Sequence, residues 1–254
     1  MTGRLAIVGL GPGAAELITP LAAEMLADAT DLVGYAPYLA RVPERAGQRR
    51  HASDNREELA RARQALDLAA SGKSVAVVSS GDPGVFAMAS AVFEAIETGK
   101  REWRDIEVTV VPGVSAMLTA AARAGAPLGH DFCVLSLSDN LKPWDLVVKR
   151  LEAAASGDFI IVLYNPASKA RLWQLGEAFR LVARHRAGWT PVIFAHAVSQ
   201  ADERVDITTL ADADPAKADM RTLIIIGSSA TRLVAGGKGR RFVYTPRHAE
   251  LVES

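Results

Sequence analysis

Short runs of apolar residues alternate along the chain with longer segments in which apolar residues recur at helical spacing. This alternation is typical of strands joined by crossover helices, so the pattern predicts an α/β fold with a mostly parallel sheet. In the first half of the chain the predicted strands are residues 5–9, 32–35, 75–79 and 108–111, and the predicted helices are residues 15–29, 55–71, 85–98 and 115–124. These elements make up a first predicted domain, residues 1–124.

The second half of the chain predicts another α/β domain, residues 125–254, which begins at a turn-rich stretch. Its predicted strands are residues 133–137, 159–164, 191–196 and 222–227, and its predicted helices are residues 146–155 and 168–185. Residues 204–210 alternate polar and apolar side chains, as an antiparallel strand does, so we expect a mixed sheet here. The tail from residue 236 has little periodicity beyond a short strand at 241–244, and we expect its end to be mobile.

Composition and charge then narrow the kind of protein. Hydrophobic residues make up 49% of the chain and charged residues 23%, as in an ordinary soluble protein. The 29 basic residues balance 29 acidic ones, so no general positive field would attract nucleic acid. We find no signal peptide, membrane span or metal-binding cluster of cysteine and histidine, and expect a cytoplasmic protein without a metal site. The single cysteine, Cys133, lies in an apolar run and is expected to pack in the core.

Three loops that contain glycine each follow a predicted strand and precede a predicted helix. The first loop is residues 9–14 (Gly-Leu-Gly-Pro-Gly-Ala), the second is residues 79–86 (Ser-Ser-Gly-Asp-Pro-Gly-Val-Phe), and the third is residues 111–116 (Val-Pro-Gly-Val-Ser-Ala). In open α/β sheets ligands bind at the carboxyl ends of the strands, so the three loops predict one shared ligand site. The Asp82 carboxylate could face this site, or could cap the next helix or make a turn with its own backbone. Ser115 is positioned to cap the helix that follows it.

These three loops, in this order, resemble those of the tetrapyrrole methylase family, whose members carry V-G-x-G-P-G, then G-D-P or G-D-A, then P-G-x-S. The resemblance covers almost the whole chain. It implies two α/β domains with a cleft between them, in which S-adenosylmethionine binds and S-adenosylhomocysteine is left as product. It also implies a tetrapyrrole substrate and a homodimer.

The resemblance implies a set of residues that bind the methyl donor. These are Pro12, Gly81, Asp82, Val85, Ser115 and Ala116 in the first half of the chain, and Tyr164, Asn165, Ala197 and Thr222 in the second. Family members usually carry an acidic residue directly after the first loop. Here Ala14 and Ala15 precede Glu16, so no direct role is expected for that acid.

Residues 33–38, 137–144 and 163–168 resemble a ring-contracting subgroup of the family. They imply methylation of precorrin-3B at carbon 17 with contraction to precorrin-4, although cobalt-precorrin-3B or another tetrapyrrole is an alternative substrate. The candidate catalytic residues are Asp139, Asn140, Lys142 and His196. The first three face the substrate or form a solvated loop, and His196 donates to the substrate or satisfies a backbone group at a strand end.

Arginines could hold the carboxylates of a tetrapyrrole through charge-assisted hydrogen bonds. Arg41 and the basic run at residues 45–51 are the candidates, and the alternative is that the run forms a solvated charged face.

Two other functions fit parts of the sequence. The first loop follows a strand, as in nicotinamide-dependent Rossmann oxidoreductases, and Asp28 or Asp31 lies near the spacing expected for the ribose-binding acid. Against this, the first loop departs from G-x-G-x-x-G, and Pro12 lacks an N–H for a pyrophosphate. A tetrapyrrole carrier without enzymatic activity would need the substrate cleft but no donor site.

Overall fold

The computed structural model describes residues 3–54, 57–168 and 171–248 of the chain. The chain divides into two compact units, Met1–Ala116 and Met117–Ser254. Helix α5 (Ala116–Ala124) begins at this division, and the boundary predicted at residues 124 and 125 falls at its end. Within the described ranges, every helix is too short or too polar to cross a membrane.

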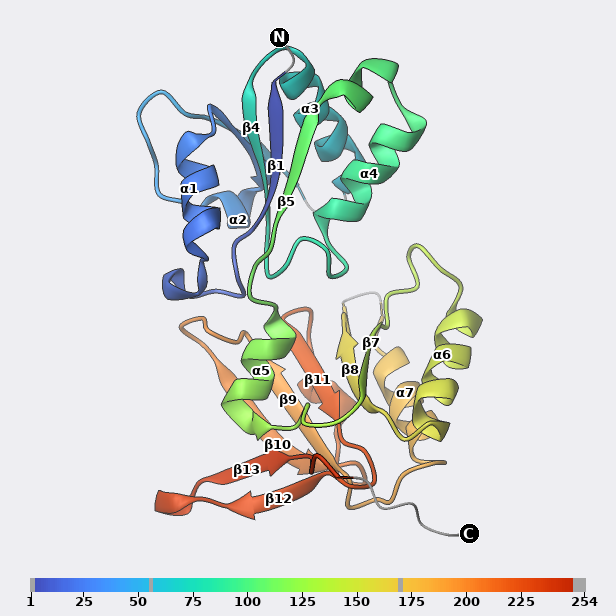
Figure 1. Cartoon of the computed structure of the whole chain (residues 1–254). Helices are drawn as coiled ribbons and strands as arrows, with labels where there is room; N and C mark the ends of the chain where they lie inside the picture. The colour runs from blue at the N-terminus through green and yellow to red at the C-terminus, as the bar shows by residue number, and fades with distance from the viewer. Residues whose placement is uncertain (1–2, 55–56, 169–170, 249–254) are drawn as a thin grey trace. The chain divides into compact units, whose positions relative to one another are not determined.

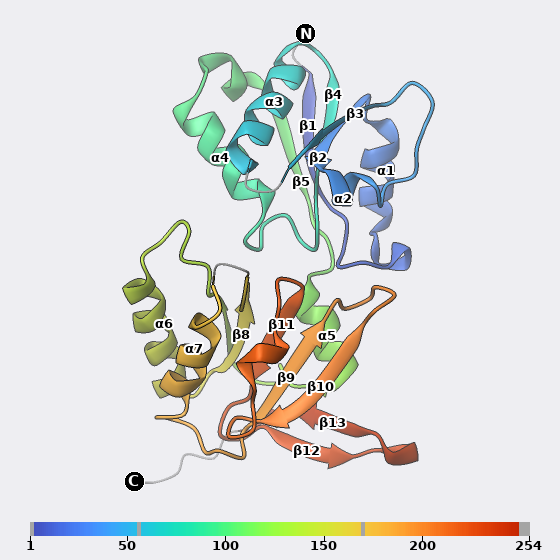
Figure 2. The same ribbon diagram turned by 180° about the vertical axis from the view of Figure 1, so that it is seen from behind.

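The first unit is built on a sheet of five parallel strands with the order β3-β2-β4-β1-β5, of which Figure 1 labels β4, β1 and β5 and Figure 2 labels all five. The strands are β1 (Arg4–Gly9), β2 (Asp31–Tyr35), β3 (Arg49–Ser53), β4 (Ser74–Ser79) and β5 (Glu107–Val111). The helices are α1 (Pro20–Asp28), α2 (Ala36–Leu39), α3 (Glu58–Ala70) and α4 (Met88–Thr98), with short 3₁₀ turns at Ala15–Leu17 and Arg101–Asp105. The parallel sheet predicted from the apolar runs is therefore confirmed.

Side chains of the central strand β1 alternate between two hydrophobic cores. Leu5 and Ile7 pack in the core on the side of α3 and α4. Ala6 and Val8 pack in the core on the side of α1 and α2. This alternation follows from the two-residue period of a strand, and it explains why strands covered on both faces read as continuous apolar runs. Figures 1 and 2 show the two helix layers from opposite sides.

Several boundaries in the first unit differ from the prediction. The helix predicted at residues 15–29 is divided, because Pro20 has no N–H to continue a helix and instead opens α1 behind its N-cap Thr19. The Thr19 Oγ1 accepts a hydrogen bond from the Ala22 N–H at 3.2 Å. Helix α4 begins at Met88 and not at residue 85, since the second loop continues through Phe86 in a left-handed conformation (φ 52°).

The second unit contains a mixed sheet with the order β10-β9-β11-β8-β7, in which only β7 and β8 are parallel neighbours. Its strands are β7 (Phe132–Ser136), β8 (Ile160–Tyr164), β9 (Pro191–His196), β10 (Arg204–Thr209) and β11 (Thr222–Ile226). Helices α6 (Trp144–Ser156) and α7 (Gln174–Val182) cover one face, and Figures 1 and 2 show α5 over the other. The mixed sheet and its antiparallel strand β10 are confirmed.

The last described part of the chain forms a small sheet with the order β12-β13-β6. Its strands are β6 (Gly125–Ala126), β12 (Arg232–Ala235) and β13 (Arg241–Tyr244). The short strand predicted at residues 241–244 is present, whereas β12 was missed. The stretch predicted as a boundary loop contains β6, which pairs with β13. The expected mobile end, residues 249–254, lies outside the described residues.

The helix predicted at residues 168–185 is shorter in the structure, where α7 spans Gln174–Val182 and residues 169–170 are not described. Cys133 is half-buried and packs against the core of the second unit, in agreement with its prediction as a core residue. Burial raises the pKa of its thiol to about 11.

Candidate functional site

The three glycine loops meet at the carboxyl edge of the sheet in the first unit. β1 lies between β4 and β5, so the loops that follow these three parallel strands are neighbours. The Gly11 N–H donates to the Gly81 oxygen at 3.2 Å, and the Gly81 N–H donates to the Gly11 oxygen at 2.9 Å. Both glycines have a positive φ, 67° and 64°, which residues with a side chain adopt at a cost. This reciprocal pair joins the first loop to the second.

The third loop approaches the other two so closely that a side chain would not fit. A Cβ atom added to Gly113 would lie 2.2 Å from the Gly81 oxygen and 2.9 Å from Gly9 backbone atoms. A Cβ atom added to Gly9 would lie 2.7 Å from the Gly113 nitrogen. The glycines are therefore required by backbone packing between loops, and the predicted meeting of the three loops is confirmed.

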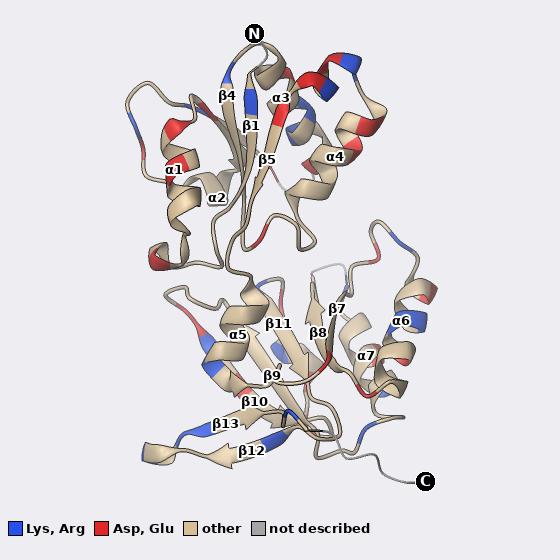
Figure 3. Ribbon diagram, in the orientation of Figure 1, with Lys and Arg blue, Asp and Glu red and all other residues tan. Residues whose placement is uncertain are grey.

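Asp82 is the only charged residue in the three loops, and Figure 3 shows a red segment in the loop between β4 and α4. Its Oδ1 accepts a hydrogen bond from the Gly84 N–H at 2.8 Å, which is the predicted turn with its own backbone. Its Oδ2 accepts from the Gly113 N–H at 3.1 Å. The half-buried carboxylate therefore ties the second loop to the third, a contact that sequence reasoning missed. Its direct contact with a ligand stays a prediction.

The other donor-site residues predicted in the first unit lie in the same loops. Pro12 is buried, Val85 is half-buried, and Ser115 is buried just before the first residue of α5, Ala116. The structure therefore brings the whole predicted group of the first unit into one cluster of loops. Phe86 in the second loop was not predicted, and it combines its left-handed conformation with 53% exposure.

The predicted residues of the second unit gather at one edge of its mixed sheet. β8 and β9 end at this edge, and β11 begins there because it runs antiparallel to both. Tyr164 and Asn165 follow from the end of β8, His196 and Ala197 from the end of β9, and Thr222 pairs in register with His196. β7 runs parallel to β8, so the loop that follows β7 lies at this edge as well.

Hydrogen bonds hold the ends of β7 and β8 together. The Asn165 Nδ2 donates to the Ser136 Oγ at 3.0 Å, and the Ser138 N–H donates to the same oxygen at 3.3 Å. The Tyr164 hydroxyl accepts from the Met117 N–H at 3.2 Å in the first turn of α5. Asn165 has a φ of 52° and Ala197 a φ of 47°. Left-handed residues other than glycine store strain and concentrate at functional sites.

The loop with the three candidate catalytic residues is partly held in place. The Asp139 Oδ2 accepts from the Gln174 Nε2 at 3.3 Å, and its Oδ1 lies 3.8 Å from the Arg171 Nε. Asn140 is exposed. Lys142 is half-buried, and burial together with the charge of Arg150 lowers the pKa of its ammonium group. The loop is therefore not wholly solvated, and its contact with a substrate stays a prediction.

The His196 side chain lies between two carboxylates. Its Nδ1 is 3.2 Å from the Asp219 Oδ1, and its Nε2 is 3.5 Å from the Asp202 Oδ2. The Asp219 Oδ1 also accepts from the Thr222 hydroxyl at 2.8 Å and from the Arg221 N–H at 2.9 Å. Asp219 was missed by sequence reasoning, although it lies three residues before Thr222, the first residue of β11.

The basic residues considered for substrate carboxylates have partners inside the first unit. Arg41 donates to backbone oxygens of the first loop, and Arg50 donates to the oxygens of Leu39 at 2.8 Å and Val42 at 2.7 Å. The His51 Nε2 lies 2.7 Å from the buried Asp31 carboxylate. The solvated face predicted for the run therefore agrees with the exposure of Arg45 and Arg49, but not with Arg50 and His51, which are half-buried and have partners.

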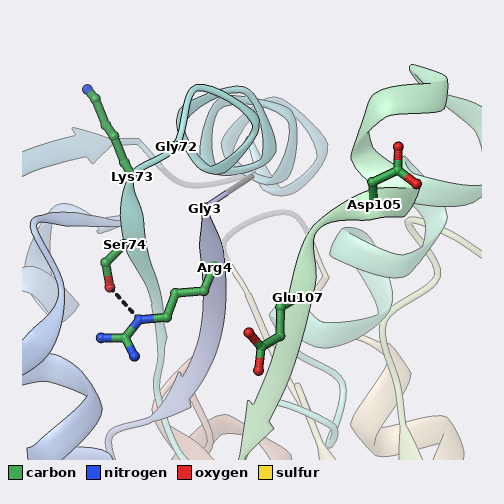
Figure 4. A pocket seen from close by; sticks show the side chains of 7 residues that line it. All are labelled: Gly3, Arg4, Gly72, Lys73, Ser74, Asp105 and Glu107. Carbon is green, nitrogen blue, oxygen red and sulfur yellow. Dashed lines mark hydrogen bonds between the residues drawn. The ribbon is translucent and has the colours of Figure 1, made fainter. Parts of the chain in front are cut away.

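A cavity of about 310 Å³ lies at the opposite, amino edge of the same sheet (Figure 4). It is lined by Gly3, Arg4, Gly72, Lys73, Ser74, Asp105 and Glu107. Its basic side chains already have partners, since Arg4 donates to the Ser74 Oγ at 2.9 Å and the Lys73 Nζ lies 3.5 Å from Asp31. The glycine loops are therefore the better ligand site, as expected for the carboxyl edge of a parallel sheet. Among the described residues, no three His, Cys, Asp or Glu side chains are grouped to hold a metal ion.

Comparison with known proteins identifies the family. The model of the Tetrapyrrole (Corrin/Porphyrin) Methylases matches residues 4–214. The chain belongs to this family. A crystal structure of the methyltransferase CobJ superposes with a TM-score of 0.91 and 49% identity, covering 96% of this chain and 100% of that one. The nicotinamide-dependent oxidoreductase considered from the first loop receives no support from these comparisons.

Curated members of the family extend the similarity over nearly the full chain. A precorrin-3B C(17)-methyltransferase from a Sinorhizobium species is 56% identical, covering 97% of both chains. The cobalamin biosynthesis protein CobIJ of Mycobacterium tuberculosis is 51% identical over 97% of this chain, which spans 48% of that protein. A probable cobalt-factor III C(17)-methyltransferase from Salmonella typhimurium is 38% identical over 96% of this chain and 98% of its own length.

Proposed function

We propose that this chain transfers a methyl group from S-adenosylmethionine to carbon 17 of precorrin-3B, with contraction of the macrocycle to precorrin-4. The observation that carries the proposal is 56% identity, over 97% of both chains, to a protein that is named for methylation of precorrin-3B at this carbon. The three glycine loops support it, because they meet at the edge of the sheet where α/β proteins bind their ligands.

The chemistry of the donor suits these loops. In methyl transfer the carbon–sulfur bond breaks, its electron pair stays on sulfur, and a new carbon–carbon bond forms, so the cationic sulfonium becomes a neutral thioether. Such a reaction needs positioning more than proton transfer. Closely packed backbone and a single carboxylate, Asp82, are what the first unit offers at this edge. Within the three loops no second acid competes with Asp82 for the sulfonium.

The donor site predicted from the family includes residues of both units. Tyr164, Asn165, Ala197 and Thr222 are proposed to contact the donor, and Asp139, Asn140, Lys142 and His196 to act on the substrate. Two of the first group, Asn165 and Ala197, have left-handed backbone. Binding of S-adenosylhomocysteine by alanine or glycine variants tests the first group, and turnover at saturating donor tests the second.

The identities favour a metal-free substrate over a cobalt-containing one. The relative named for precorrin-3B is 56% identical, whereas relatives named for cobalt-factor III are 38% and 40% identical. The experiment is to incubate the purified chain and S-adenosylmethionine with precorrin-3B in one series and cobalt-factor III in another, and to analyse the products by mass spectrometry. Precorrin-3B should gain one methyl group and yield a contracted ring, and reactions without the donor should leave it unchanged.

Other results of this experiment would contradict the proposal. If only cobalt-factor III is turned over, the substrate contains cobalt and the proposal of a metal-free substrate is wrong. Binding of precorrin-3B without any methyl transfer, under conditions where S-adenosylhomocysteine also fails to bind, would favour a tetrapyrrole carrier.

We also propose that the enzyme works as a cytoplasmic homodimer, which rests on the family resemblance. Light scattering should give twice the chain mass of 27.0 kDa. A mass of one chain at micromolar concentration would contradict the dimer without affecting the proposed reaction.

A further inference from the structure

One guanidinium group spans the first and second glycine loops. Arg41 lies two residues after the end of α2 and is half-buried. Its Nη2 donates to the Leu10 oxygen at 2.7 Å and to the Gly11 oxygen at 2.9 Å. Its Nη1 lies 3.3 Å from the Ser80 Oγ, next to Gly81 in the second loop. Arg41 therefore contacts both loops at the point where Gly11 and Gly81 exchange hydrogen bonds.

Arg41 has no ion pair with an acidic residue among those that the structure describes. Burial lowers the pKa of its guanidinium, while nearby Tyr38 opposes this shift. Its Nε is buried and has no hydrogen-bond partner among the described atoms. Burying a cation without a carboxylate is unfavourable, so this position is not explained by charge pairing. Instead, the Arg41 side chain donates hydrogen bonds to two consecutive backbone oxygens, those of Leu10 and Gly11.

These contacts set the orientation of the first loop. The peptide between Leu10 and Gly11 is held on both sides, because its oxygen accepts from Arg41 and its N–H donates to Gly81. The Gly11 oxygen accepts from both Arg41 and the Gly81 N–H. Glycine at a positive φ has other conformations within reach, and ordering a loop at the moment of binding weakens affinity. Holding this peptide in advance keeps the next residue, Pro12, in a constant place.

We propose that Arg41 is a positioning residue for the methyl-donor site, which acts by holding the first loop in its binding conformation. This inference rests on the proposed function and goes beyond it, because it assigns to Arg41 a part in donor binding that requires no contact with the donor. A planar guanidinium can bond two neighbouring oxygens and a hydroxyl at once, whereas a lysine ammonium is a point charge on a flexible stem.

The chain contains a matched control in the same unit. Arg50 also donates to two backbone oxygens, those of Leu39 and Val42 at 2.8 and 2.7 Å, and is also half-buried. Its contacts are with α2 and the residues after it, and none of those recorded involves a glycine loop. Arg41→Lys and Arg50→Lys thus remove similar hydrogen bonds, but only Arg41 bonds directly to a glycine loop, whereas Arg50 holds the backbone on either side of Arg41 and can affect that loop only indirectly.

The test is calorimetric titration of both variants with S-adenosylhomocysteine, together with thermal unfolding. We expect Arg41→Lys to raise the Kd at least about tenfold, and Arg50→Lys to change it by less than about twofold, although both should lower the Tm by similar amounts. In steady state, Arg41→Lys should raise the KM for S-adenosylmethionine about tenfold and leave kcat within about twofold. Ser80→Ala, which keeps Arg41 and its bonds to the first loop, should raise the Kd less than Arg41→Lys does.

The outcomes separate this inference from the function on which it rests. Equal Kd values for the unmodified chain and Arg41→Lys, or equal weakening in both lysine variants, would overturn the role of Arg41 and leave the methyltransferase intact. If Arg41→Lys does not fold, Arg41→Gln takes its place in the same comparison, and there a raised Kd supports the inference and an unchanged Kd overturns it. Failure of the unmodified chain to bind S-adenosylhomocysteine would overturn both.

Discussion

The two units gather their candidate residues at one sheet edge by different means. In the first unit all strands are parallel, so the loops after β1, β4 and β5 share an edge as a consequence of strand direction alone. In the second unit the edge combines the ends of β7, β8 and β9 with the beginning of β11. The positions of strands along the chain therefore predict that the candidate residues of the first unit lie together. In the second unit the same prediction would require knowing which strands pair as antiparallel neighbours, and the sequence pattern does not show this.

The two edges also differ in what holds them. In the first unit the backbones of Gly9, Gly11, Gly81 and Gly113 touch directly, and one carboxylate adds a cross-link. In the second unit side chains make most of the bonds we have described, as in the pair of Asn165 with Ser136. The first edge should therefore be damaged most by an added atom, and the second by the loss of a polar group. Four substitutions test this difference, and their expected effects decrease in order.

The largest effect is expected from Gly113→Ala. Its Cβ would lie 2.2 Å from the Gly81 oxygen, and backbone atoms cannot move aside as a flexible side chain can. We expect the affinity for S-adenosylhomocysteine to fall at least about a hundredfold, or about 2.8 kcal/mol. Gly237→Ala is the control, because no atom lies within 4 Å of the added Cβ and its φ is not positive. Unchanged binding by Gly113→Ala would contradict the close packing of the loops.

Asp82→Ala should have the next largest effect. Without the carboxylate, the N–H groups of Gly84 and Gly113 lose their partner, and the second loop is no longer tied to the third. We expect S-adenosylhomocysteine to bind at least about tenfold more weakly, with the fold retained. Asp82→Asn keeps one acceptor oxygen and should lose less. Asp105→Ala at the opposite edge serves as control in calorimetry, and full affinity in Asp82→Ala would remove Asp82 from the site.

A smaller effect is expected from the second unit, at the left-handed residue Asn165 (φ 52°). Asn165→Ala and Asn165→Gly both lose the hydrogen bond to Ser136, but only alanine is strained in this conformation. After allowing for the greater freedom of unfolded glycine, we expect the glycine variant to be more stable by about 0.5–1 kcal/mol. Urea unfolding measures this difference. An alanine variant as stable as the glycine variant would show that the backbone is not held left-handed.

Sequence reasoning succeeded where burial imposes a pattern. The central strands β1, β4, β8 and β11 are continuous apolar runs because both of their faces are covered. The three loops were visible because glycines lie at or just after the ends of β1, β4 and β5. The edge strands β3 and β12 were missed, since Arg232–Ala235 is exposed throughout and Arg49–Ser53 has no fully buried residue, so neither segment alternates buried apolar with exposed polar side chains.

The contacts of the candidate site could be predicted only in part. A carboxylate in the second loop was visible, but its bond to Gly113 joins residues 31 positions apart. Arg41 reaches the first loop over 31 positions, and Asp219 reaches His196 over 23. Such contacts join residues that are far apart in the sequence, so local periodicity cannot predict them. They depend on the fold, and the family to which the fold belongs was indicated only by the resemblance of the loops.

The smallest effect is expected from Asp219→Asn, which tests the side-chain bonding of the second edge through pH. Burial alone would raise the pKa of the Asp219 carboxyl, but hydrogen bonds from Thr222 and the Arg221 N–H, together with His196, lower it below its ordinary value of 3.8. A lowered folded-state pKa means that the ionised carboxylate stabilises the fold above about pH 5, and that this contribution declines as the pH falls through 3.8 and below.

Because the Asp219 side chain is 56% exposed, solvent screens the interaction, and we expect less than about 1 kcal/mol. The free energy of unfolding of the unmodified chain should therefore exceed that of Asp219→Asn at pH 7 and approach it at about pH 3. Raising the salt concentration at pH 7 should shrink the same difference. If the difference in the free energy of unfolding depends on neither pH nor salt, the charge of the Asp219 carboxylate does not stabilise this edge. The contrast with the first unit, whose edge is held mainly by backbone contacts, would then be weaker.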